Sequence, residues 1–426
     1  LRLVVERERE ITAFKPQEYW NLTAELQDTN KVYAPFKALL EKKGTKKYKP
    51  ASAEETAAVL SSIQTGKFVV SKVKKTVMKS HAPAPFTTSS LQQDASTKLG
   101  YTAPETMNVA QHLYEGLETE NGDHIAFITY MRTDSVRVSK EAQTAALNKI
   151  RTTYGEEYVP EKPNYYASKK GAQDAHEAVR PIDLEMTPEK AKKLLDKKHF
   201  ALYKLIYERF LASQMSEAKY NSAQMEIENN GYIFKASGKV LLFAGFTAVY
   251  QDVKKDDEDG AESAKLLPDL KEGDEVLEVS MQKEQKFTKP PLRYTDASLV
   301  KVMEEKGIGR PSTYATIIAK LNQKYVKKEG KYMIPTPVAY EVVDMLVSCF
   351  KDVMDVGFTA GMENRLDDIE EGGVDWHAVI GNFYPGFEKN LKSASSYGDQ
   401  LTQEICGKCG HFMIRRIGKF GKYLAC

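Results

Sequence analysis

The stretch ITYMRTDS, residues 128–135, places a tyrosine and an arginine two positions apart in a dense polar run. A phenol is a weak nucleophile at neutral pH because its ordinary pKa is about 10. A guanidinium beside it stabilises a phenolate, and it also stabilises the negative charge that grows on a phosphate during substitution. If the extended geometry continues, Tyr130 and Arg132 lie on one face. The pair therefore indicates attack on a phosphodiester, whereas most of the 23 tyrosines need only fill the core or the surface.

A second polar cluster, QDAHEAVRPID, covers residues 173–183. In a helical turn His176 and Arg180 would share one face, where they could hold a phosphate or pass a proton to a leaving 3′-oxygen. A structural histidine that bonds to the backbone explains the same residues as well. The cluster is not a zinc site of the H-E-x-x-H kind, because the second histidine is absent.

The chain has four cysteines, too few for a disulfide framework in a chain of this length, which favours a reducing compartment. Cys406 and Cys409 form a C-x-x-C pair and Cys426 follows, which resembles most of a four-cysteine zinc ribbon. We expect the remaining cysteine beyond Cys426, and weak or no zinc binding by three thiolates alone. His411 could substitute, but its position does not fit the motif. Cys349 is expected in the core.

The elements around these residues follow from hydrophobic periodicity and turn residues. The run IAFITY, 125–130, is short, apolar and β-branched, which predicts a buried strand that ends at Tyr130. Residues 217–288 alternate around the turn pairs Asn230-Gly231 and Ser237-Gly238, which predicts a β module. HAPAPF, 81–86, predicts an extended linker. The remaining predictions are helices at 1–11, 89–99, 104–116 and most of 139–213, and strands at 18–27 and 67–79.

The region 294–335 combines a first helix, a break at KGIGRPS, a second amphipathic helix and a hairpin at KKEGKYMI. Proline suits the first turn of a helix, so we expect Pro311 there. Helix, turn, helix and hairpin in this order resemble a winged helix, a unit that commonly binds nucleic acid. An ordinary helical hairpin is the alternative.

Composition restricts the class of protein without deciding it. The chain has 426 residues, enough for about two to four domains, and 42% apolar residues can build sizeable cores. The longest apolar runs, such as VLLFAGF at 240–246, are much shorter than the ~20 residues that span a bilayer. We see no signal peptide, so we expect a cytoplasmic protein. A net charge of +2 neither requires nor excludes nucleic acid, and the runs EKKGTKKYK and KDDED are typical of solvated loops.

Four motifs, in order along the chain, carry a family resemblance: PAPFTTSSLQQDAS, ITYMRTDS, AHEAVRP and EKGIGRPSTYATII. They resemble the type IA DNA topoisomerases, and the resemblance runs over essentially the whole chain. It implies that Tyr130 cuts one DNA strand and becomes joined to its 5′-phosphate. It implies that Arg132 positions and stabilises the scissile phosphate, and that His176 lies beside the cleavage site. The DNA-binding residues that it implies are Arg2, Gln111, Glu115, Arg310 and Thr313, although a surface ion pair on a helix also explains Arg2 and Glu115.

The resemblance also implies a multi-domain α+β fold. It is a toroidal core in which a helical tyrosine domain and a winged-helix-like domain are joined by β-rich arms, with hinges near 81–86 and 214–218. The expected divisions are 1–20 and 289–395 for the helical DNA-binding domain, 21–82 and 217–288 for the arms, 83–216 for the tyrosine domain, and 396–426 for the start of a truncated zinc ribbon.

The family's Mg²⁺-binding Toprim domain has no counterpart in this sequence. The chain begins at Leu1 inside a helical pattern and stops at the third cysteine of a set, so we expect a fragment of a longer protein that is inactive alone. The expected activity is ATP-independent relaxation of negatively supercoiled DNA, with single-stranded DNA as partner, Mg²⁺ held by the missing domain, and a monomeric enzyme. The alternative is a non-catalytic protein that binds single-stranded nucleic acid on the same fold. The decatenating and reverse-gyrase branches of the same family are harder to exclude as alternatives to the expected relaxing enzyme.

Overall fold

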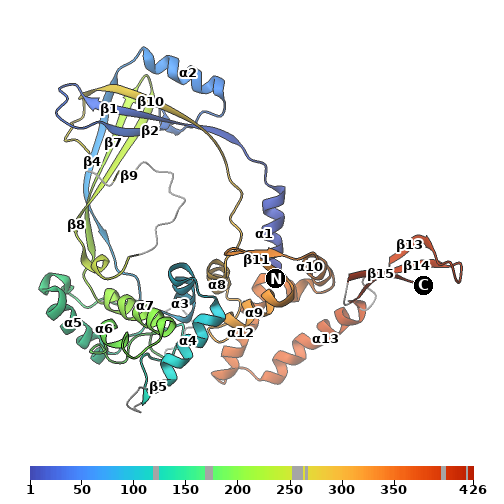
Figure 1. The fold of residues 1–426 in the computed structure, drawn as a ribbon. Coiled ribbons are helices and arrows are strands. Elements are labelled where there is room, and N and C mark those ends of the chain that lie inside the picture. Colours follow the sequence, from blue (N-terminus) through green and yellow to red (C-terminus); the bar gives the residue numbers. More distant parts are fainter. Residues whose placement is uncertain (119–123, 168–175, 252–261, 264–266, 395–399, 419–420) are drawn as a thin grey trace.

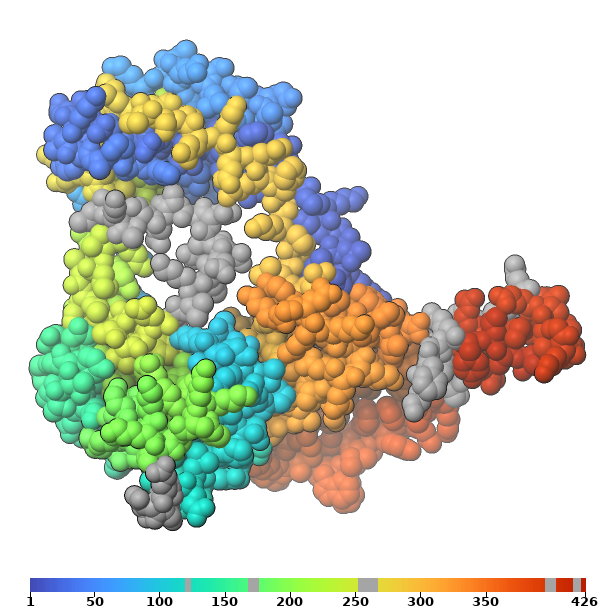
Figure 2. Space-filling view, in the orientation of Figure 1, coloured from blue at the N-terminus to red at the C-terminus, as the bar shows by residue number. Residues whose placement is uncertain are grey.

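In a computed structural model of the chain, residues 1–118, 124–167, 176–251, 262–263, 267–394, 400–418 and 421–426 are described. A β-barrel lies opposite two helical bodies, and the three together form a ring (Figure 1). The space-filling view keeps an opening between the barrel and the helical bodies (Figure 2). The mixed, toroidal fold predicted from the sequence is confirmed.

Six long antiparallel strands form the barrel, in the order β2-β1-β10-β4-β7-β8, and pairing of β8 with β2 closes it. Helix α2 (Ala53–Gln64) adds Val59 and Ile63 to its core. The short strands β3 (Lys46–Lys47) and β9 (Glu262–Ser263) extend the sheet. The six strands are β1 (Glu18–Asp28), β2 (Phe36–Lys43), β4 (Phe68–Ser80), β7 (Ala218–Asn229), β8 (Tyr232–Phe243) and β10 (Glu275–Phe287).

Alternation of apolar and polar residues explains the barrel strands. In β1, Leu22, Ala24 and Leu26 are fully buried, so every second side chain faces the core. The hairpin between β7 and β8 turns at Asn230 and Gly231, both with positive φ, as predicted. The second predicted turn, Ser237-Gly238, is wrong, because both residues lie inside β8, where they pair with β7.

The tyrosine core is a helical body around residues such as Phe86, Ile128 and Tyr203, all fully buried. Its elements are α3 (Thr88–Asp94), a π-helical turn (Ala95–Leu99), α4 (Ala103–Glu115), β5 (Leu117–Glu118), β6 (His124–Ile125), α5 (Lys140–Tyr154), a 3₁₀ turn (Glu156–Tyr158), α6 (Pro188–Ala191), α7 (Lys197–Ser213) and a second 3₁₀ turn (Gly245–Ala248). The predicted helices at 89–99 and 104–116 are therefore confirmed, while 139–213 is helical only in parts.

The predicted strand at 125–130 is wrong beyond Ile125. Residues 126–130 cross the core in irregular, extended form, with a single bridge from Ile128 to Pro181. Phe127 donates its N–H to the carbonyl of Leu113 at the end of α4, and Thr129 donates to that of Arg180. Because different segments satisfy these groups one at a time, no ladder forms.

The predicted helical turn at His176 is also wrong. The segment is extended, since Val179 pairs with Phe86 across a single bridge. Arg180 forms an ion pair with Glu177 at 2.7 Å and donates to the carbonyl of Pro181. The spacing of His176 and Arg180 is compatible with a helix. The segment is extended instead, because Ala178 and Val179 are both buried in the core.

The helical body begins with α1 and continues after the barrel. As predicted, the order of helix, turn, helix and hairpin appears in α8, α9, β11 and β12. Helix α9 begins at Tyr314, so Pro311 lies in the preceding turn and not in the first helical turn. The elements are α1 (Arg2–Ala13), α8 (Asp296–Glu305), α9 (Tyr314–Lys324), β11 (Val326–Glu329), β12 (Tyr332–Pro335), α10 (Pro337–Cys349), α11 (Lys351–Met354), α12 (Val356–Glu370) and α13 (Trp376–Ala394).

A small C-terminal sheet of β13 (Gln400–Ile405), β14 (Phe412–Gly418) and β15 (Gly421–Ala425) projects from the ring (Figure 1). Cys349, expected in the core, is half-buried at the end of α10. Among the described helices, none is both long and apolar enough to cross a bilayer.

The ring closes where the tyrosine core meets the helical body, a contact that we call the gate junction. Here α3 packs beside α8 and α4 beside α9. Ser89 Oγ donates a hydrogen bond to Glu304 Oε2 at 2.7 Å, and Ala103 of α4 is buried in the core of the helical body. We call the opposite contact, between the tyrosine core and the barrel, the hinge junction; the chain crosses it at 80–86, 213–218 and 243–246.

Candidate active site

A cleft of about 510 Å³ lies on the gate junction and takes its walls from both helical bodies. The tyrosine core contributes Tyr114, Tyr130, Arg132, Thr133, Asp134 and His176, and the helical body contributes Arg310, Pro311, Ser312, Glu363 and Asp367. Four residues that the sequence singled out, Tyr130, Arg132, His176 and Arg310, therefore meet in one cleft. They come from three segments that are far apart in the chain.

Tyr130 is half-buried between two other rings. The Tyr114 ring lies edge-on to it with centroids 5.2 Å apart, and the His176 ring lies tilted against it at 5.4 Å. Aromatic neighbours at these distances restrict the orientation of the phenol. The two rings therefore hold Tyr130 in the wall of the cleft that Arg132 and Arg310 also line.

Thr88, the first residue of α3, holds the segment that carries Tyr130 and Arg132. Its hydroxyl donates to the carbonyl of Met131 at 2.7 Å and accepts the N–H of Thr133 at 2.8 Å, while its own N–H donates to the Thr133 carbonyl. Thr88 and Thr133 are both buried, so water does not compete for these bonds. This anchoring fixes the backbone on both sides of Arg132 and leaves its side chain exposed.

Arg310 lies in a tight turn before α9. The Arg310 N–H donates to Thr313 Oγ1 at 2.9 Å, and the Thr313 hydroxyl donates back to the Arg310 carbonyl. Gly309 has a φ of +79°, and a Cβ there would lie 2.9 Å from Thr313 Oγ1, so this turn requires glycine. Thr313 thus shapes the turn and is not among the residues that line the cleft.

Two carboxylates of α12 face Arg310. Its Nη2 lies 3.0 Å from Asp367 Oδ2, and its Nε lies 3.8 Å from Glu363 Oε2. No carboxylate of the described residues forms an ion pair with Arg132. An anion in the cleft could bind the guanidinium of Arg132 directly. To bind Arg310, it would have to replace Asp367 and Glu363 as the partners of that guanidinium.

Besides Thr313, three predicted DNA-binding residues lie outside the cleft. Gln111 and Glu115 flank Tyr114 on α4, where the Gln111 side-chain amide donates to the Glu115 carboxylate. Arg2 forms an ion pair with Glu6 on α1 and donates to the carbonyl of Met354. The Arg2–Glu6 pair agrees with the alternative raised from the sequence, an ion pair on the surface of a helix. Glu115 also has its partner on its own helix, but that partner is the uncharged amide of Gln111.

Sequence reasoning missed Thr88, Tyr114, Glu363 and Asp367 as site residues. Thr88 lies within the motif PAPFTTSSLQQDAS, and Tyr114 lies between the predicted residues Gln111 and Glu115, so a signal for both was present. Glu363 and Asp367 are spaced by four on one helix, which puts them on one face. Acidic pairs at that spacing are common in helices. Glu363 and Asp367 can be recognised as site residues only in the structure, where α12 approaches the turn at Arg310.

The three C-terminal cysteines converge as predicted. Their Sγ atoms lie within 4.8 Å of one another, and this is the only group of three or more His, Cys, Asp or Glu side chains in the described residues that could share a metal ion. Backbone N–H groups of Lys408 and Cys409 lower the pKa of Cys406 to about 7. The set fits three positions of a tetrahedral zinc site. His411 bonds through Nδ1 with the Cys409 carbonyl.

A ring of barrel and helical bodies, with a tyrosine, two arginines and a histidine where the ring closes, is the arrangement of a type IA strand-cutting enzyme. A family model described as DNA topoisomerase matches residues 1–381. The chain therefore belongs to the type IA DNA topoisomerases.

Known relatives agree over the whole chain. DNA topoisomerase 1 of Fervidobacterium islandicum is 43% identical over 441 residues, and that of Treponema pallidum is 41% identical over 438. All of this chain is matched in both, but it spans only 60% and 58% of their lengths. The full-length topoisomerase I from Thermotoga maritima has a similar solved structure, with a TM-score of 0.81 and 39% identity over 100% of this chain and 67% of that one.

Proposed function

We propose that this chain carries the strand-cleaving machinery of a topoisomerase that acts on single-stranded regions of negatively supercoiled DNA. Tyr130 Oη attacks a backbone phosphorus, the P–O3′ bond breaks, and the 5′-phosphate becomes bound to Tyr130. The phenol loses its proton and the departing 3′-oxygen takes one up. The reverse attack by the 3′-hydroxyl religates the strand. One phosphodiester replaces another of similar energy, so no ATP is needed.

The observation that carries this proposal is the meeting of Tyr130, Arg132, His176 and Arg310 in one cleft. Arg132 and Arg310 are placed to hold the non-bridging oxygens and to stabilise the charge that grows on them. His176, against the Tyr130 ring, can pass a proton to the leaving 3′-oxygen. Cleavage at a gate junction also has a topological use, because the two DNA ends are then held by different bodies. Separation of those bodies opens a gap for a second strand.

The described residues around Tyr130 do not form a Mg²⁺ site. Two of the carboxylates that line the cleft, Glu363 and Asp367, pair with Arg310, and the only close cluster of ligands is the cysteine set. Mg²⁺ ligands in the longer relatives would therefore belong to other parts of the protein, such as a Toprim domain.

Zinc would be held by Cys406, Cys409 and Cys426, and none of the described residues adds a fourth ligand to this cluster. Bound there, the metal would crosslink the ends of the small C-terminal sheet. The proposed protein is a cytoplasmic monomer.

A covalent trap tests the proposal. The chain is joined to the Toprim domain of a relative, mixed with end-labelled single-stranded DNA and Mg²⁺, and stopped with detergent. We expect an adduct with the fragment that carries the 5′-phosphate at the break, and we expect it to fall by more than about 10³-fold in Tyr130→Phe, because the nucleophile is lost. The chain without the added domain should form no adduct and should not relax supercoils.

Two outcomes would count against the proposal. An adduct that persists in Tyr130→Phe would place the nucleophile elsewhere. Salt-sensitive binding of DNA by the completed protein, with no adduct under any condition, would indicate a non-catalytic nucleic-acid-binding protein on this fold.

A further inference from the structure

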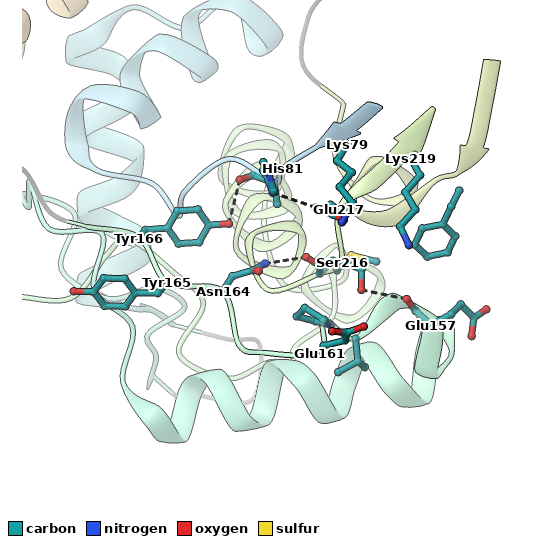
Figure 3. Close-up of a pocket in the computed structure, with 15 residues that line it drawn as sticks. Lys79, His81, Glu157, Glu161, Asn164, Tyr165, Tyr166, Ser216, Glu217 and Lys219 are labelled. Carbon is teal, nitrogen blue, oxygen red and sulfur yellow. Dashed lines mark hydrogen bonds and ion pairs between the residues drawn. The ribbon is translucent and has the colours of Figure 1, made fainter. Parts of the chain in front are cut away.

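The hinge junction contains a cavity of about 620 Å³ between the tyrosine core and the barrel (Figure 3). The barrel side contributes the ends of β4 and β8 and the start of β7, with Lys79, Lys219 and Phe243. The tyrosine core contributes an irregular segment that follows α5. We call this segment, residues 157–166, the clasp.

Tyr166 in the clasp bonds to two of the chain crossings at once. Its hydroxyl lies 3.1 Å from the carbonyl oxygen of Ala82 and 2.9 Å from that of Ser213, and it donates toward both. Burial raises the pKa of Tyr166 to about 12, so the phenol keeps the proton that it donates. A single side chain therefore links the crossing at 80–86 to the crossing at 213–218.

Asn164 holds the second crossing from the same side. Its side-chain amide donates to the carbonyl of Ser213 at 2.9 Å and to that of Met215 at 2.8 Å. Gln143 of α5 donates to the Asn164 carbonyl and to the side chain of Gln214. The clasp is thus fixed to a helix of the tyrosine core while it grips the backbone that leads into the barrel.

The N-terminal part of the clasp reaches the third crossing. Ser216 donates its N–H to the Tyr158 carbonyl and its hydroxyl to the Glu157 carbonyl. The Tyr158 ring packs against Phe243, at the end of β8, with centroids 4.9 Å apart. Phe246 then donates its N–H to the Ser216 carbonyl, so the third crossing is bonded to the second.

The crossings at 80–86 and 213–218 also meet directly, through the last pair of the β4–β7 ladder, Ser80 with Ala218, and through side-chain ion pairs that are weaker. Lys79 and His81 both reach the carboxylate of Glu217, but the His81 side chain is 83% exposed and that of Lys79 is 58% exposed. Ion pairs at such exposure contribute little, about 0–1 kcal/mol in general. Hydrogen bonds from the clasp to the carbonyls of buried Ser213 and Met215 are shielded from water and restrain the geometry more.

We propose that the clasp sets the angle between the barrel and the tyrosine core, and thereby how often the ring opens at the gate junction. Ala82, Ser213 and Met215 lie where the backbone leaves the tyrosine core, so bending of the crossings at the hinge junction shifts their carbonyls relative to Asn164 and Tyr166. The clasp bonds are therefore present in the closed ring and are stretched or lost in the open one. Asn164 and Tyr166 act as positioning residues; only the use of this opening to pass DNA rests on the proposed function.

Distance measurements across the gate junction test this inference without DNA. Spin labels are attached through unnatural amino acids at the exposed positions Thr97 and Lys301, which lie on the two sides of the gate, so the native cysteines stay unlabelled. Pulsed dipolar spectroscopy on the 426-residue chain then gives the fraction of molecules in which the pair is far apart.

Two variants weaken the clasp. Asn164→Asp replaces the donor with an oxygen that faces two carbonyls, and we expect the separated fraction to rise at least about tenfold. Tyr166→Phe removes only the hydroxyl, and we expect a rise of about three- to fivefold. The controls are Asn148→Asp, which places the same charge on an exposed part of α5, and Tyr165→Phe, which changes a ring that is 89% exposed. Both controls should match the parent chain.

The inference is overturned if both clasp variants keep the parent distance distribution while their thermal unfolding shows an intact fold. If Asn164→Asp does not fold, Tyr166→Phe decides alone. The distances are independent of cleavage, so a chain that opens as expected but forms no adduct would contradict the proposed function and leave the clasp in place.

Discussion

The tyrosine core has two junctions with the rest of the ring, and they are built differently. At the hinge junction the chain itself crosses between the two bodies, and side chains of the clasp bond to main-chain carbonyls. At the gate junction helices meet through side chains, such as Ser89 and Glu304. A junction with continuous backbone can bend but cannot come apart, whereas one made of side-chain contacts can separate and close again. The proposed nucleophile, Tyr130, lies at the junction that can separate.

The largest effect that would sharpen this comparison is expected at Arg132. Arg132→Ala removes the guanidinium that we propose to face the reacting phosphate, and we expect adduct formation by the completed protein to fall by about 10²–10³-fold. Arg132→Lys should lie between, because it keeps the charge and loses the planar fork. Lys219→Ala, which removes a cation from the hinge cavity, should leave the rate of adduct formation nearly unchanged. Equal losses at the two sites would mean that the cleft is not the reaction site.

The anchoring of the catalytic segment comes next. Thr88→Val leaves the Thr133 N–H and the Met131 carbonyl without their buried partner, so we expect the free energy of unfolding to fall by about 1–3 kcal/mol. Urea unfolding of the chain measures it. Thr106→Val is the matched control, since Thr106 is equally buried and bonds only to the carbonyl four residues back in its own helix. A loss at Thr88 no greater than at Thr106 would remove the anchoring role.

At Arg310 we expect a moderate change in affinity for DNA. Arg310→Ala removes one proposed phosphate contact and leaves the carboxylates of Glu363 and Asp367 without their guanidinium partner. The dissociation constant for single-stranded DNA should rise about tenfold. The slope of the logarithm of the binding constant against the logarithm of the salt concentration should become shallower by about one. Adding Glu363→Gln and Asp367→Asn should recover part of the affinity. No recovery would indicate that the two carboxylates only orient the guanidinium.

The smallest effect is expected from one hydroxyl at the gate. Ser89→Ala removes the hydrogen bond to Glu304, and the separated fraction in the spin-label experiment should rise about three- to fivefold. Ser71→Ala, which removes a hydroxyl from the barrel, is the control. If Ser89→Ala leaves the fraction unchanged while the clasp variants raise it, the hinge junction alone sets the opening of the ring.

Sequence patterns predicted those parts of the fold in which local periodicity and packing agree. The stripe of Tyr314, Ile318 and Leu321 gives a helix, and β1 and β4 follow from alternation. The run at 125–130 has the composition of a strand, yet it lacks a regular neighbour to pair with. Closure of the barrel depends on the pairing of β2 with β8, which are almost two hundred residues apart, and no local signal marks it.

The residues of the site also divide into those that a local sequence pattern marks and those that only the packing of distant segments brings together. Tyr130, Arg132 and His176 could be named because each lies in a dense polar motif. The carboxylates that face Arg310, and the anchoring by Thr88, depend on how distant segments approach each other. The divisions between domains proposed from the sequence remain predictions, although three separate hydrophobic cores are consistent with them. The role of each DNA-binding residue also remains a prediction.

The closed barrel has a consequence for solubility. Each of its six long strands has a partner on both sides, because β8 pairs with β2 as well as with β7. An open sheet would present unpaired N–H and C=O groups along its edge, and such edges invite pairing with other chains and aggregation. A ring that opens must expose surfaces repeatedly in a crowded cell. Closure therefore removes such an edge only near the closed end of the barrel, because β4 and β10 pair with each other over two residues alone, Phe68 with Val276 and Val69 with Glu275.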